Sequence, residues 1–158
     1  MPLVRDTAIK EIMRRIYGIT TNAGYTFSMK RVIRNPKTEP HVEDMPCTNI
    51  FESDDFTIKK SQRGATKMPA YGRRFEVWLE SWIEATSEGK SSEEIIYFLQ
   101  ALRSALFRDG ITLGGLVIEF NEMQTSRIYR PEIGDHVIGI GTLYDVVFVE
   151  DFSKSLIP

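Results

Sequence analysis

The stretch Arg73–Ala85, RRFEVWLESWIEA, alternates between two kinds of side chain as a β-strand does. One face of such a strand carries the apolar residues Phe75, Val77, Leu79 and Ile83. The other face carries glutamates and tryptophans in turn, namely Glu76, Trp78, Glu80, Trp82 and Glu84. A solvated face does not need two tryptophans, and a buried face does not accept three unpaired glutamates. The first face therefore predicts part of the core, and the second predicts a surface with a further task.

Four more segments are rich in β-branched and aromatic residues between turn signals, which predicts strands. They are Tyr25–Arg34, Cys47–Phe51, Gly115–Met123 and Val137–Val149. In the last of these, one face carries Thr142, Tyr144, Val146 and Phe148, and the other carries Leu143, Asp145, Val147 and Val149.

Two segments predict amphipathic helices. The first has apolar residues at helical spacing before a stop at Gly18, and these are Ala8, Ile9, Ile12, Met13 and Ile16. The second starts with a capping box, Ser91 and Glu94, and ends at Asp109-Gly110. Its apolar face comprises Ile95, Phe98, Leu99, Leu102, Ala105 and Leu106.

The order helix, strands, helix, strands predicts an α+β fold, with the two helices packed on one face of a largely antiparallel sheet. The 158 residues, of which 42% are hydrophobic and 27% are charged, fit one domain spanning 1–158.

Two connections, 35–45 and 53–72, are longer than simple turns. Loops of this length in a compact domain are usually functional or disordered. The second connection carries four basic residues, Lys59, Lys60, Arg63 and Lys67. We expect it to be either a solvated loop or a segment that becomes ordered on meeting a partner.

The composition argues against several classes of protein. The single cysteine, Cys47, excludes an intrachain disulfide and indicates a reducing compartment. The N-terminus lacks the apolar core of a signal peptide, and no apolar run approaches the ~20 residues that span a bilayer. A net charge of −2 gives no overall signature of binding to nucleic acid or acidic lipid. We therefore expect a soluble intracellular protein with no membrane partner.

No motif for a metal or a cofactor is complete. His41, His136 and Cys47 lack the spacing of a zinc site, so we expect solvated or hydrogen-bonded histidines and a buried, inert thiol. Gly139-Ile140-Gly141 lacks the third glycine of a dinucleotide fingerprint, because Tyr144 stands in its place. Glycine here is expected to serve a bulge or close packing. We expect no metal and no cofactor.

The glutamates of the opening stretch are poorly spaced for acid–base chemistry. Successive members lie ~13 Å apart along a strand, whereas a glycosidase pair needs carboxyl groups about 5–9.5 Å apart. A base-stacking platform for single-stranded nucleic acid is also disfavoured, because glutamates beside Trp78 and Trp82 repel phosphate. Two interpretations stay open: the tryptophans pack under a helix, or they contact another subunit.

The layout of the chain resembles the tail terminator, or tail completion, proteins of long-tailed bacteriophages. The resemblance is carried by the order of elements and by FEVWLESWIEA (75–85), LFRDGITLGG (106–115) and LYDVVFVEDF (143–152). In that family the second helix is followed by a turn from an aspartate to L-G-G, which Asp109, Leu113, Gly114 and Gly115 match. The closing strand commonly holds a tyrosine, as Tyr144 does here.

This resemblance implies a non-enzymatic virion protein, assembled in the host cytoplasm, that forms a ring of usually six subunits. Such a ring caps the head-proximal end of the tail tube, stops tail polymerisation and provides a surface for head–neck joining. The implied partners are other copies of the chain, the tail tube protein, a neck or connector protein, and a sheath protein in contractile tails. DNA would pass through the ring without sequence-specific recognition.

Several residues are candidates for contacts with a subunit or the tube. They are Trp78, Trp82, Glu76, Glu80, Lys59, Lys60, Arg63 and Lys67. The alternatives are a neck or head-closure protein, a single-stranded nucleic-acid binder, and a small hydrolase or ligand-binding module. The hydrolase would require Glu76 or Glu80 to converge with Asp135 and His136 in one pocket.

Overall fold

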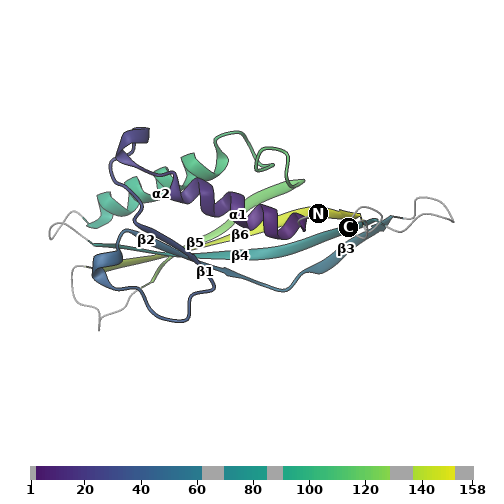
Figure 1. Ribbon diagram of the computed structural model, residues 1–158, viewed down its shortest axis with the longest axis horizontal. Helices are drawn as coiled ribbons and strands as arrows, with labels where there is room; N and C mark the ends of the chain where they lie inside the picture. Colours follow the sequence, from purple (N-terminus) through teal and green to yellow (C-terminus); the bar gives the residue numbers. More distant parts are fainter. Residues whose placement is uncertain (1–2, 62–69, 85–90, 129–136, 152–158) are drawn as a thin grey trace.

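The computed structural model describes residues 3–61, 70–84, 91–128 and 137–151 (Figure 1). Its elements, in chain order, are α1 (Val4–Tyr17), the 3₁₀ turn η1 (Thr21–Ala23), β1 (Arg31–Arg34), the 3₁₀ turn η2 (Val42–Asp44), β2 (Cys47–Glu52), β3 (Phe56–Ser61), β4 (Ala70–Glu84), α2 (Ser91–Phe107), β5 (Glu119–Ile128) and β6 (Val137–Asp151).

The strands form one sheet in the order β1-β2-β4-β6-β5. Strands β1 and β2 are parallel, and the other pairs are antiparallel. At its centre, β4 and β6 pair along their full 15 residues. Strands β2 and β3 lie end to end along the other edge of β4, because β2 pairs with Val77–Trp82 and β3 pairs with Ala70–Arg74. The predicted α+β fold is confirmed.

Both helices lie on the same face of the sheet (Figure 1). The apolar faces predicted for α1 and α2 supply buried residues to one core, together with the odd-numbered face of β4 and the even-numbered face of β6. At the centre of this core, Phe120 of β5 stacks on Tyr144 of β6 with ring centroids 4.9 Å apart. Tyr144 is fully buried, so its ring belongs to the core and to no exposed surface.

Two arginines fix the ends of α1. At its start, the Arg5 guanidinium lies 4.6 Å from the centre of the Phe75 ring, and its Nε donates to Glu52 of β2 over 3.1 Å. At its end, the buried Arg15 donates to both carboxylate oxygens of Asp109, over 2.7 and 3.0 Å, and to the carbonyl of Leu106 over 2.9 Å. These bonds tie the first helix to the sheet and to the end of the second helix.

Three predicted boundaries were wrong. Of Tyr25–Arg34, strand structure covers β1 alone, because Phe27 leaves the sheet and stacks on Phe98 of α2 with centroids 5.2 Å apart. The segment 53–72 contains β3 and the beginning of β4, and so is not a single connection. Strand β5 begins at Glu119 and not at Gly115.

The delayed start of β5 has a local cause. Leu113, Gly114 and Gly115 have φ of 48°, 72° and 88°, which lie outside the extended region and form a turn. The matched aspartate of the predicted turn, Asp109, is the partner of Arg15. The connection predicted at 35–45 carries η2 and otherwise no helix or strand.

Candidate assembly surface on the sheet

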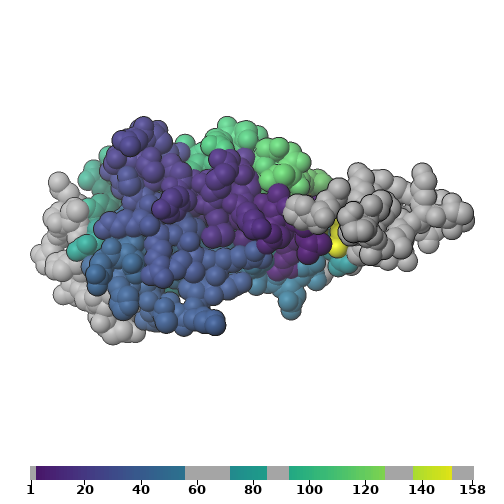
Figure 2. Space-filling view, in the orientation of Figure 1, coloured from purple at the N-terminus to yellow at the C-terminus, as the bar shows by residue number. Residues whose placement is uncertain are grey.

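The even-numbered side chains of β4 lie on the face of the sheet opposite the helices, which we call the open face. Neither helix covers this face, so of the two interpretations left open, the one in which both tryptophans pack under a helix was wrong. Among the described residues, the connection 35–46 projects from this side at one end of the sheet (Figures 1 and 2). The connection 35–46 therefore covers one end of the open face and leaves the rest of this face outside its cover.

Trp82 lies in the covered end. Its side chain is 1% exposed and packs in a small cluster with Met45, Cys47 and Val137. Its ring occupies the space above Gly139 of β6, where an added Cβ would lie 2.5 Å from ring atom Cζ3. The indole Nε1 donates to Glu80 Oε1 over 3.0 Å. Trp82 is an internal packing residue, and its candidacy for a subunit contact is withdrawn.

Trp78 lies beyond this cover and is half-buried. Its ring extends over Gly141, where an added Cβ would lie 2.1 Å from Cζ2. The glycines were predicted to serve a bulge or close packing, and the second of these roles is confirmed. The register places Phe51 of β2 and Leu143 of β6 directly opposite Trp78 on its two sides. Phe51, Trp78 and Leu143, all half-buried, form a line across three strands that we call the apolar row.

Polar residues flank the apolar row on both sides. On one side, Asn49 and Glu80 are paired in the register. On the other, Glu76 lies opposite Asp145, and this like-charged pair is bridged by Arg74, which bonds to the carboxylate of Asp145 and lies 3.6 Å from Glu76. An aromatic centre inside a hydrogen-bonded, charged rim has the anatomy of a protein interface.

The carboxylates of the open face have structural partners. Glu76 interacts with Arg74, and Glu80 accepts the indole proton of Trp82. Asp135 and His136 lie outside the described residues, so their convergence with these glutamates stays a hypothesis. Across the described ranges, no cluster of three or more His, Cys, Asp or Glu residues has a geometry that could hold a metal ion.

Cys47 belongs to the Trp82 cluster and is 1% exposed. Burial, followed by the nearby Asp44 carboxylate, raises the pKa of the thiol to about 11. The thiol therefore stays protonated at neutral pH, which confirms the prediction of a buried, inert cysteine. His41 is exposed at the start of η2, as predicted for a solvated histidine.

The structure describes the backbone of two of the four basic candidate residues. Lys59 and Lys60 belong to β3, where the register sets them opposite Gly72 and Tyr71 of β4. Arg63 and Lys67 lie outside the described residues. No helix in the described part of the chain is long and apolar enough to cross a membrane.

Comparison of the sequence with models of known protein families finds no match, and comparison with curated proteins finds no similar chain.

Proposed function

We propose that the protein is a tail terminator of a long-tailed bacteriophage. Copies of the chain form a ring, usually of six, at the head-proximal end of the tail tube. The ring stops tail polymerisation and presents a surface to the neck. Its partners are the tail tube protein, a neck or connector protein and, in a contractile tail, the sheath protein.

The apolar row supports this proposal most strongly. Tryptophan is enriched among the residues that dominate binding energy at protein interfaces, above all when a polar rim surrounds it. Phe51, Trp78 and Leu143 occupy such a position on a rigid sheet whose other face is filled by helices. A rigid, two-sided sheet of this kind suits a subunit that must stack on a tube or on its neighbours.

The proposal is tested by adding the purified chain to tail tubes assembled in vitro. A terminator is expected to bind one end of each tube, halt elongation and appear as a ring in negative-stain images. The Trp78→Ala variant is expected to bind tubes about tenfold or more weakly, because a central aromatic anchor is lost. Continued tube growth at saturating protein would contradict the proposal.

A matched control is Tyr17→Ala, which removes an aromatic ring that is 59% exposed at the end of α1, on the helix side. This variant is expected to cap tubes as the unmodified chain does. Binding to a purified connector with no binding to tubes would instead identify the protein as a neck or head-closure protein.

A further inference from the structure

The apolar row on the open face is surrounded by carboxylates. Glu76 and Glu80 lie two residues before and two residues after Trp78, so all three side chains project from the same face of β4. The register places Asp145 of β6 and Glu119 of β5 on this face as well. The apolar row therefore has a rim that contains four carboxylates.

The same rim holds fewer cations. Among the described side chains of β2, β4, β5 and β6, Arg74 is the only cation on the open face, and it bonds to the carboxylate of Asp145. The indole that donates to Glu80 is neutral and leaves the charge of that carboxylate in place. Four carboxylates around one guanidinium leave three negative charges in excess among these described side chains. This charge attracts cationic groups and repels phosphate, so the open face favours a basic protein surface over nucleic acid.

A basic surface with an apolar centre matches both the chemistry and the spacing of this face. Its apolar side chain can pack on the Trp78 ring, while the stems of lysine or arginine lie on apolar atoms and their charges meet the rim. Glu76 and Glu80 lie ~13 Å apart, with Trp78 midway between them. An extended segment with a basic, an apolar and a basic residue at alternate positions has the same spacing.

We propose that the apolar row and its rim bind a basic surface with an apolar centre, and that this surface lies at the end of the tail tube. The identity of the partner rests on the proposed function, whereas its charge follows from the open face. Carboxylates that lose water without gaining a cation weaken an interface. The rim therefore selects a basic partner and opposes the pairing of two open faces, which carry the same charge.

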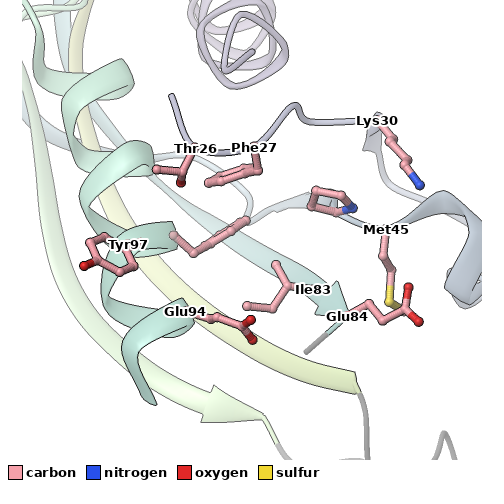
Figure 3. A pocket seen from close by; sticks show the side chains of 10 residues that line it. Thr26, Phe27, Lys30, Met45, Ile83, Glu84, Glu94 and Tyr97 are labelled. Carbon is pink, nitrogen blue, oxygen red and sulfur yellow. The ribbon is translucent and has the colours of Figure 1, made fainter. Parts of the chain in front are cut away.

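A second apolar surface of the chain serves as an internal comparison. A hollow of about 480 Å³ lies at the end of the sheet where β4 finishes (Figure 3). Its walls come from the start of α2, the end of β4 and the segments before β1 and β2. Phe27 and Ile83 face its central space, and Lys30, Glu84 and Glu94 are among its lining residues. A ligand recognised through apolar contact alone would enter this hollow as readily as it would bind the apolar row.

Two synthetic peptides test the charge of the partner on the full chain, without tubes. One carries lysine, leucine and lysine at alternate positions, and the other carries glutamate in place of each lysine. In ¹H–¹⁵N NMR spectra, the lysine peptide is expected to shift the amides of Phe51, Trp78 and Leu143 and to leave those of Phe27 and Ile83 unchanged. The glutamate peptide is expected to shift neither set. Raising the ionic strength about tenfold should raise the Kd of the lysine peptide about fivefold or more, because salt screens exposed charges.

Removal of charge from the rim tests whether the tube end is the partner. Glu76→Gln combined with Glu119→Gln is expected to raise the Kd for tube ends about fivefold or more. Glu80 and Asp145 are kept, because their carboxylates bond to other side chains of the sheet. The NMR spectrum of the double variant establishes that it is folded.

The matched control is Glu93→Gln, which makes the same change at an exposed position in the first turn of α2, on the helix side. This variant is expected to bind tubes as the unmodified chain does. The inference is overturned if both peptides shift the amides of the open face equally, if neither does, or if the lysine peptide shifts those of the hollow instead.

The tube experiment separates this inference from the proposed function. Capping that is unchanged in the Glu76 and Glu119 variant would overturn the inference and leave the proposed function standing. A chain that binds the lysine peptide on its open face but does not cap tubes would support the basic partner and contradict the tube as its source.

Discussion

Trp78 and Trp82 lie on one strand, on one face, four residues apart, and each ring fills the space left by a glycine on β6. They differ in what lies above them. Met45 and Cys47 bury the Trp82 ring, whereas Trp78 is half-buried between Phe51 and Leu143. The comparison shows that a tryptophan stacked on a strand glycine is a local arrangement. A distant segment of the chain decides whether it becomes core or surface.

Replacing each tryptophan by alanine is expected to give the largest difference in the free energy of unfolding. Trp82→Ala leaves a cavity in a buried cluster and should lower the free energy of unfolding by ~3–5 kcal/mol. Trp78→Ala exposes a glycine on a half-open surface and should lower it by only ~1 kcal/mol. Urea denaturation followed by circular dichroism measures both. Equal losses would mean that the cover over Trp82 contributes little to its packing.

Filling the glycine positions is the next test. An added methyl at Gly139 meets the enclosed Trp82 ring at 2.5 Å, so Gly139→Ala should cost ~1–3 kcal/mol of stability. At Gly141 the clash with Trp78 is closer, at 2.1 Å, yet this ring can turn toward solvent. Gly141→Ala should therefore cost less than ~1 kcal/mol while weakening tube binding. Thermal unfolding compares the two, and a larger loss at Gly141 would contradict the placement of Trp78 outside the covered end of the open face.

The last effect is absent at neutral pH and concerns Cys47, which packs in the Trp82 cluster. Its pKa is raised from an ordinary value of about 9 to about 11, so the unfolded chain ionises first as the pH rises. The folded state should therefore lose stability between about pH 9 and pH 11 through this group. Subtracting the stability of Cys47→Ala from that of the unmodified chain, at each pH, isolates the slope.

The reactivity of the Cys47 thiol also measures how well Trp82 and Met45 shield it from solvent. We expect it to react with a thiol reagent only on unfolding in the unmodified chain, and to react in the folded state of Trp82→Ala. Reaction at the same slow rate in both proteins would show that Met45 alone shields the sulfur.

Much of this arrangement was predictable from alternation. The apolar face of β4, the two faces of β6 and the packing role of Gly139 and Gly141 all follow from local patterns. The difference between the tryptophans did not follow from the pattern, because each has a glutamate two residues before it and another two residues after it. The cover over Trp82 comes from Met45, in a segment with two prolines and no apolar period. Contacts of that kind depend on where a loop returns, which alternation does not encode.

Strand β3 was missed for a related reason. Its sequence, FTIKKS, is short and ends in polar residues, so it resembles the loop around it. It becomes a strand because β4 extends to Ala70 and presents an edge to pair with. The buried Arg15 was equally hidden, since its partner Asp109 lies 94 residues away along the chain. The hollow at the end of β4 gathers four separate segments, and no single stretch of sequence predicts it.

The position of β6 in the sheet has a consequence for how the protein is made. Strands β4 and β5 both pair with β6, the last described strand in the chain. During synthesis on the ribosome, β4 therefore waits without its longest partner, and β5 waits without the strand that holds it in the sheet. Unpaired edges invite association with other chains. The emergence of Val137–Asp151 supplies the missing partner of both strands, so these edges of β4 and β5 stay unpaired until that segment has left the ribosome.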